Sequence, residues 1–411
     1  MTIVEFFDIA SLENICSTLL CRPDKVVLIG HSNSRLKHTI ALYTDVARSK
    51  GIKTEFFGVK VSRNNLNAIV DKLEDVVRNN PEDCIFDLTG GDDLYLVAVG
   101  IIMERYRGRV QCHRFNFTSD QLYDCDSDGS VLEAKSLKIS VADNVAIYDG
   151  KIIYEGDGDF FTYRWDFNAD FINDVKLMWQ ICAKNPRLWN IQIGTIGGIC
   201  DYLEMPSELE VSYDRHEAEE ILRENRIKYA CVPWILNDLK KKGLIRALTV
   251  DENISFEFKN EQVKKCLTIS GQILELYVAI TLLAIKDEDG EPLYNDVKVG
   301  TVINWGHEQF DDTSTVNEVD VIAMKGAIPI FISCKNGFFD ANELYKLSAV
   351  ADKFGNKYAK KVLVTTEFDR LGDLADFLSS RMIDMEIRCI SDVDQMPEGE
   401  FERILTSLWK N

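Results

Sequence analysis

The segment Asn317–Lys335 constrains the fold of this 411-residue chain more than any other stretch. Two apolar runs, Val319–Met324 and Ile328–Cys334, flank a short turn at Lys325–Ala327. This pattern predicts a β-hairpin, because strands of this length joined by a glycine-containing turn pair with each other. The chain must therefore place at least one buried pair of neighbouring strands in its C-terminal part.

Charged side chains lie at the open end of this predicted hairpin. Side chains alternate between the two faces of a strand, so Glu318 and Asp320 share one face of the first strand, while Ser333 and Lys335 share one face of the second. Charged groups beside an apolar core are costly to desolvate unless they are paired or used. Two interpretations remain at this point: a surface hairpin with solvated ends, or a functional site.

Elements on both sides of the hairpin favour the functional interpretation. Ser270–Lys286 has the apolar periodicity of a helix and carries Glu275 in its first turns. Asp340–Gly355 is predicted to form a second helix and Lys360–Phe368 another buried strand. The order helix, strand, strand, helix, strand allows the helix acid to converge with the hairpin's carboxylate and lysine on a divalent metal.

This order resembles that of the PD-(D/E)XK metal-dependent nucleases, in which a helix carries Glu and the two strands carry the Asp and the Lys. The sequence NEVDV followed by FISCKNG most resembles that of CRISPR-associated nucleases with an N-terminal CARF sensor domain, which cyclic oligoadenylate activates. The resemblance implies that Asp320 and Glu275 bind the metal and that Lys335 acts on the attacking water or the transition state.

One position departs from the family pattern. Ser333 stands two residues before Lys335, where the general pattern has Asp or Glu. The missing carboxylate has two candidate replacements, Glu343 on the following helix and Glu318 on the first strand. Hydrolysis of a phosphodiester needs an activated water and neutralised phosphate charge, and Mg²⁺ or Mn²⁺ bound by oxygen ligands supplies both.

The N-terminal part alternates strands and helices. Lys25–Gly30, Thr54–Val59 and Cys84–Leu88 are predicted strands, each followed by a predicted helix. This βαβαβ rhythm predicts a Rossmann-like doubly wound sheet. The chain is therefore expected to belong to the α/β class, and ligands are expected just beyond the carboxyl ends of its strands.

Two polar loops occupy that position. Neither is a dinucleotide or Walker A loop, and the glycine pair of the second also suits a simple tight turn. Resemblance to the CARF domain implies instead that both loops bind cyclic oligoadenylate, with cyclic tetra-adenylate the expected activator, across a homodimer. A two-fold ligand matches an isologous two-fold interface. The candidate binding residues are His31, Ser32, Asn33, Ser34, Arg35, Thr89, Gly90, Gly91 and Asp92.

These features predict three domains: a CARF sensor at 1–150, a connector at 151–265 and a restriction-endonuclease-like α/β domain at 266–411. Helices followed by a predicted hairpin at 244–260 make the connector a possible winged-helix module. Lys240–Lys242 and Arg246 either lie along phosphates or form a solvated helix end that complements the macrodipole.

Composition limits the class of protein. The net charge of −20 argues against general coating of nucleic acid, which needs a basic surface. Eleven cysteines without a C-x-x-C pair favour reduced, buried thiols over disulfides or zinc. No apolar run reaches membrane-spanning length and no signal peptide is recognisable, so a cytoplasmic protein that does not bind membranes is expected.

The sequence thus predicts a cyclic-oligoadenylate-activated, metal-dependent nuclease of type III CRISPR antiviral defence that hydrolyses DNA, RNA or both. The alternative is a nucleotide-sensing, DNA-binding regulator with a degenerate nuclease fold, which Ser333 favours. The joint presence of Glu275, Asp320 and Lys335 favours the enzyme.

Overall fold

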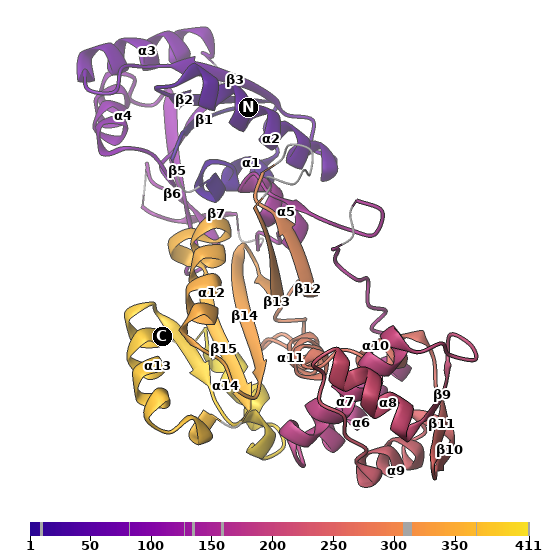
Figure 1. The fold of residues 1–411 in the computed structure, drawn as a ribbon. Coiled ribbons are helices and arrows are strands. Elements are labelled where there is room, and N and C mark those ends of the chain that lie inside the picture. The colour runs from indigo at the N-terminus through magenta and orange to yellow at the C-terminus, as the bar shows by residue number, and fades with distance from the viewer. Residues whose placement is uncertain are drawn as a thin grey trace.

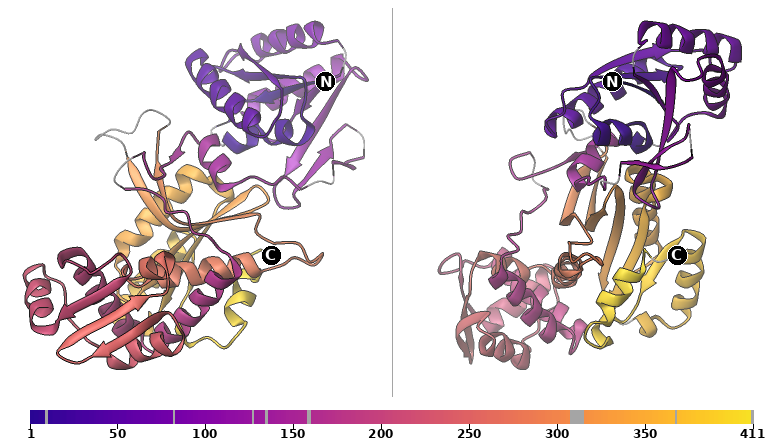
Figure 2. Two further views of the ribbon diagram at one scale, coloured as in Figure 1. Left: turned by 90° about the vertical axis from the view of Figure 1, so that its right-hand side faces the viewer. Right: turned by 180° about the vertical axis from the view of Figure 1, so that it is seen from behind.

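The computed structural model describes residues 1–8, 11–81, 83–126, 128–133, 136–157, 160–306, 315–366 and 368–409. Within these residues the strands form sheets of seven, three and six strands (Figure 1). The views in Figures 1 and 2 agree that the seven-stranded and three-stranded sheets lie apart, each beside the six-stranded sheet. The expected α/β class is confirmed.

The seven-stranded sheet has the crossover order of a Rossmann-like fold. Its first five strands are parallel, and the last two are antiparallel additions at one edge. The chain builds outward from β1 on one side and then crosses to β4 on the other, so the topological switch point lies between these two strands. The strands in spatial order are β3 (Glu55–Lys60), β2 (Lys25–Gly30), β1 (Thr2–Phe6), β4 (Cys84–Asp87), β5 (Val110–Asn116), β6 (Gln121–Asp124) and β7 (Val131–Glu133).

Helices cover both faces of this sheet. On one face α3 (Leu66–Asn79) and α4 (Asp93–Arg105) share an apolar core with β1, β2 and β4. On the other face lie α1 (Cys16–Cys21), α2 (Asn33–Ser49) and α5 (Val141–Ile147). The 3₁₀ turn η1 (Ser11–Asn14) connects β1 to α1 and begins close to the carboxyl end of β1.

The three-stranded sheet belongs to a helical module with a hairpin wing. Its strands are antiparallel in the order β10 (Ile245–Val250), β11 (Asn253–Phe258) and β9 (Glu210–Asp214). The helices of the module are α6 (Ala169–Cys182), α7 (Pro186–Tyr202), α8 (Arg215–Glu224), α9 (Pro233–Lys241) and α10 (Glu261–Cys266). Near the end of α9, Lys240 donates to Leu248 O of β10 and Lys242 donates to Gln180 Oε1 of α6, both within the same module.

The six-stranded sheet contains the predicted hairpin, since β13 and β14 pair antiparallel across the Gly326 turn. The helices α12 (Ala341–Phe354) and α13 (Asp373–Asp384) pack on one face, and α11 (Gln272–Ala284) and α14 (Glu400–Ser407) lie on the other. The strands in spatial order are β16 (Ile387–Ile390), β15 (Lys360–Thr366), β14 (Ile328–Asn336), β13 (Val316–Lys325), β12 (Asp296–Asn304) and β8 (Lys151–Ile152).

The N-terminal domain and the helical module contact the six-stranded sheet and its helices at different ends. At one end, the 3₁₀ turn η2 (Asn356–Tyr358) meets the N-terminal domain, and Tyr358 bonds to Glu13. At the other end, Asn336 Nδ2 of β14 donates to Asn190 Oδ1 of α7, 2.7 Å away. In the described part of the chain, no helix combines the length and apolarity needed to cross a membrane.

Candidate functional site

The hairpin opens where the side chain of Asp320 takes over a backbone hydrogen bond. Register pairing of β13 with β14 runs as far as Val321 opposite Ile332. Beyond that point the N–H of Cys334 donates to Asp320 Oδ2, 2.6 Å away, and Ser333 Oγ donates to the same oxygen at 3.1 Å. The carboxylate is thereby fixed at the mouth of the hairpin.

Lys335 joins this carboxylate to the neighbouring helix. Its Nζ lies 3.3 Å from Asp320 Oδ2 and 2.9 Å from Glu343 Oε2 of α12. The other oxygen of Glu343 accepts a hydrogen bond from Lys346, 2.8 Å away. The structure thus brings together four residues singled out in the sequence, Asp320, Ser333, Lys335 and Glu343, and Lys346 completes a polar cluster of five.

Glu275 approaches from the opposite face of the sheet, on the first turns of α11. It accepts a hydrogen bond from Gln272 Nε2, 2.8 Å away. Burial and the charges of Asp320 and Glu318 raise the pKa of Glu275 well above its ordinary value. Glu318 is more exposed, and partial desolvation and Asp320 raise its pKa as well. Three carboxyl groups therefore repel one another across the mouth of the hairpin.

The ion pairs of the cluster stabilise the charged forms of Lys335 and Glu343, and the pKa of each group shifts accordingly. Burial lowers the pKa of Lys335, but Asp320 and Glu343 outweigh it and raise the pKa above its ordinary value. Burial likewise raises the pKa of Glu343, but hydrogen bonds from Lys346 and Lys335 outweigh it and hold the pKa low. These two side chains stabilise each other as charged groups.

The donor set suits a hard divalent cation in its chemistry, since it consists of carboxylate oxygens crowded against one another. Across the residues that the structure describes, however, no three His, Cys, Asp or Glu side chains are arranged to hold a metal ion. Asp320 and Glu343 each direct one carboxylate oxygen at Lys335. A cation at this place would replace Lys335 as the partner of at least one of them.

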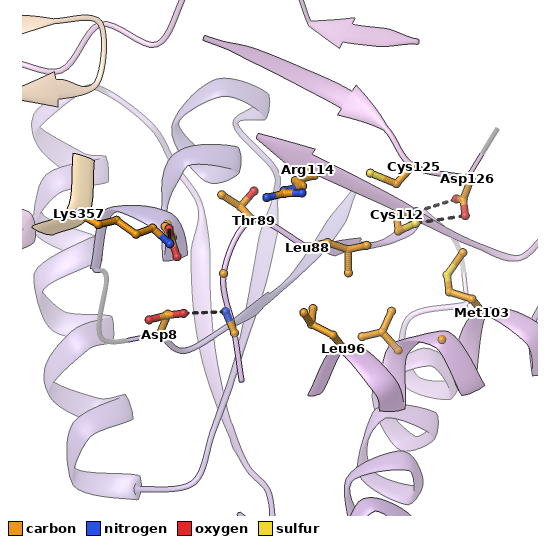
Figure 3. A pocket seen from close by; sticks show the side chains of 15 residues that line it. Asp8, Leu88, Thr89, Leu96, Met103, Cys112, Arg114, Cys125, Asp126 and Lys357 are labelled. Carbon is orange, nitrogen blue, oxygen red and sulfur yellow. Dashed lines mark hydrogen bonds and ion pairs between the residues drawn. The ribbon is translucent and has the colours of Figure 1, made fainter. Parts of the chain in front are cut away.

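A cavity of about 660 Å³ lies at the switch point of the N-terminal sheet, between the ends of β1 and β4. Figure 3 shows Lys357 and Asp8 on one side of it, and Leu96 and Met103 on the other. Its lining residues are Asp8, Glu13, Leu88, Thr89, Gly90, Gly91, Leu96, Val99, Gly100, Met103, Cys112, Arg114, Cys125, Asp126 and Lys357. The loop Thr89–Gly91 from the sequence analysis belongs to this set.

Each residue of that loop has a physical reason to be there. Thr89 Oγ1 donates to Asp87 and accepts from the N–H of Phe115, 2.8 Å away, so it braces β4 against β5. A Cβ at Gly90 would lie 3.1 Å from that of Glu13. Gly91 has a φ of +114°, which glycine adopts freely, and a Cβ there would lie 2.7 Å from Phe6.

The other expected loop lies one strand away from the switch point, after β2. Ser32 caps α2, which begins with Asn33, Ser34 and Arg35. His31 Nδ1 lies 2.6 Å from the hydroxyl of Tyr95 on α4. Like Asp92, which caps α4 through the N–H of Leu94, these residues are outside the lining of the cavity in this structure.

Five charged lining residues were not singled out in the sequence: Asp8, Glu13, Arg114, Asp126 and Lys357. Asp8 follows β1, a strand that the sequence analysis missed, and Glu13 belongs to η1. Arg114 lies on β5, and Lys357 comes from the C-terminal half of the chain. A strand prediction at residues 2–6 was the one signal that would have pointed to Asp8.

Comparison with known proteins gives similarity in structure only. No protein-family model matches the chain, and no curated protein matches its sequence. The crystal structure of protein VC1899 from Vibrio cholerae has a TM-score of 0.72 at 17% identity, over 100% of this chain and 97% of that one. Can2 from Sulfobacillus thermosulfidooxidans, in complex with cyclic tetra-adenylate, has a TM-score of 0.67 at 17% identity, over 100% and 99%. The chain shares its entire fold with both.

Proposed function

We propose that this protein is a metal-dependent nuclease of type III CRISPR antiviral defence, activated by cyclic oligoadenylate. The observation that carries the proposal is the bridge from Lys335 to Asp320 and Glu343 at the mouth of the hairpin. Asp320 and Lys335 are the types expected of a PD-(D/E)XK site, and they lie in contact on neighbouring strands.

The chain's own residues would divide the work as follows. Asp320 and Glu275, with Glu343 or Glu318 in place of the acid absent at Ser333, would hold Mg²⁺ or Mn²⁺. When bound, such an ion supplies an acidified water and neutralises phosphate charge. Lys335 would orient the attacking water or stabilise negative charge in the transition state of phosphodiester hydrolysis, because its ammonium lies at the mouth of the hairpin beside the acids that would hold the ion.

The N-terminal cavity would bind the activator, and we take cyclic tetra-adenylate as the first ligand to test. Two features support this: the switch-point location and the shared fold with Can2, whose structure contains that nucleotide. Arg114 and Lys357 would supply positive charge to its phosphates.

Two copies of the chain would share the ligand. Helix α4 is apolar on nearly every side and leaves Leu96 and Val97 39% and 52% exposed. A helix of this composition is normally covered on all sides. Leu96 also lines the cavity, so a partner that covers α4 would reach the ligand. An isologous dimer about α4 meets both conditions.

The regulator alternative keeps one specific observation in its favour. Ser333 is 8% exposed and donates to Asp320, so a hydroxyl stands where the second acid of the motif is expected. A sensor with such a site would bind DNA through the winged module and cut nothing. Cleavage assays separate the two functions.

The test is cleavage of labelled single-stranded DNA, single-stranded RNA and supercoiled plasmid with Mn²⁺, with and without cyclic tetra-adenylate. The proposal predicts activator-dependent cleavage of at least one substrate. Tight binding of the activator without cleavage of any substrate would favour the regulator instead.

A further inference from the structure

Glu13, a buried acid of the N-terminal domain, is held by two side chains from the C-terminal half. The side chain of Glu13 is 3% exposed, and its Oε1 lies 2.9 Å from Lys357 Nζ. The hydroxyl of Tyr358 donates to the same oxygen. The Tyr358 ring also stacks on Phe117, with ring centroids 4.1 Å apart. The turn η2 is therefore anchored at the edge of the N-terminal cavity.

Charge in this cavity is unfavourable for a phosphate-bearing ligand as it stands. The lining contains three acids and two cations, Arg114 and Lys357. Asp8 and Asp126 are engaged with backbone N–H groups of Gly91 and Cys112. Glu13 is different, because its charge is balanced by a lysine that is itself 64% exposed and could turn toward a ligand.

Building on the function proposed above, we propose that Lys357 is an activator-binding residue that exchanges Glu13 for a phosphate of the ligand. A mobile ammonium forms strong, charge-assisted bonds with phosphate oxygens. The exchange breaks the ion pair between Lys357 and Glu13, and this opposes binding. Without the ligand, Lys357 stays paired with Glu13. The C-terminal half thereby contributes directly to the sensor cavity.

Helix α12 connects this residue to the candidate active site. Its first turn carries Glu343, which holds Lys335, and its last residue, Phe354, precedes η2. The backbone is closely packed between α12 and η2, because a Cβ at Gly355 would lie only 2.3 Å from the Cβ of Ala359. A buried apolar stripe seats the helix on the sheet. Helix α12 and η2 are therefore a continuous, packed connection between Glu343 and Lys357.

The test measures binding of cyclic tetra-adenylate to the full-length protein by calorimetry. Lys357→Met should weaken binding by about tenfold or more, and Lys357→Arg should restore most of it. The matched control is Lys360→Ala, an exposed lysine three residues further on that lies outside the lining of this cavity. Melting temperatures verify that each variant is folded.

The variant Glu13→Gln distinguishes the proposed exchange of partners by Lys357 from simple repulsion between Glu13 and the ligand. Gln keeps an oxygen for the Tyr358 hydroxyl but releases Lys357, so binding should tighten several-fold. In a Lys357→Met background the same change should do little, which a double-mutant cycle quantifies. Tightening of equal size in both backgrounds would mean that Glu13 merely repels the ligand, and it would overturn the exchange.

The remaining outcomes separate this inference from the function on which it rests. Unchanged affinity in Lys357→Met, with the wild type binding normally, would overturn the inference alone. Failure of the wild-type protein to bind any cyclic oligoadenylate would overturn the proposed function and, with it, the role of Lys357.

Discussion

Lys335 and Glu343 form an ion pair in which Nζ lies 2.9 Å from Oε2, and this contact ties strand β14 to helix α12. The same ammonium contacts Asp320 at 3.3 Å, so one lysine neutralises two acids at the mouth of the hairpin. Any divalent cation that binds there must compete with Lys335.

Asp320→Asn should weaken Mn²⁺ binding by at least about tenfold, because it removes a charged ligand while leaving an oxygen to accept from Cys334 N and Ser333 Oγ. Lys335→Ala should retain Mn²⁺ binding, since it removes the competitor of the cation. Calorimetric titration of both variants checks this. Equal Mn²⁺ affinity in the wild type and Asp320→Asn would rule Asp320 out as a ligand.

Gly90→Asp should abolish activation. Its Cβ would lie 3.1 Å from the Cβ of Glu13, and the new carboxylate would join the acids already at the cavity. We expect loss of cyclic tetra-adenylate binding with unchanged Mn²⁺ affinity and a folded protein. Full activation of this variant at ordinary activator concentrations would place the sensor site elsewhere.

Val97→Asp should convert the proposed dimer into a monomer and weaken activator binding, because a charge would be buried at the interface about α4. Leu132→Asp is the control, since Leu132 is equally exposed, at 52%, but lies on β7. Analytical ultracentrifugation gives the mass of each variant. A wild-type protein that is monomeric with bound activator would contradict the shared site.

Glu5→Gln should make the stability of the protein less sensitive to pH. Burial, followed by the charge of Asp87 and a hydrogen bond with it, raises the pKa of Glu5 well above 4.5. The folded protein therefore keeps a proton that the unfolded chain releases above about pH 4.5, and stability falls as the pH rises toward the folded-state pKa.

Gln cannot lose that proton. Each pKa unit corresponds to about 1.4 kcal/mol, so the difference in Tm between Glu5→Gln and the wild type should shift in favour of the variant between pH 5 and pH 8. Thermal melting across this range checks the direction. A difference that is independent of pH would mean that Glu5 is ionised in the folded protein.

The hairpin was predictable because strand alternation and turn chemistry are local. Once β13 and β14 are paired, Asp320 and Lys335 must come close, and the structure brings them into contact. The α/β class followed equally from the regular alternation of strands and helices. Glu343 was foreseen as a neighbour only because α12 follows directly after β14.

Other features depended on information that no local pattern contains. Strand β1 carries Glu5, a buried acid that interrupts its apolar run, and this strand was not predicted from the sequence. Asp8, which follows β1, was therefore not among the candidate binding residues. The contact of Lys357 with Glu13 joins opposite ends of the chain, so only the tertiary structure reveals it.

The most direct measurement is the single-turnover rate of cleavage with Mn²⁺ and cyclic tetra-adenylate for the wild type, Lys335→Ala and the control Lys353→Ala on the far end of α12. The account predicts activator-dependent cleavage that falls by about 100-fold or more in Lys335→Ala and is preserved in Lys353→Ala. Cleavage by Lys335→Ala at the wild-type rate would contradict the assignment of the active site.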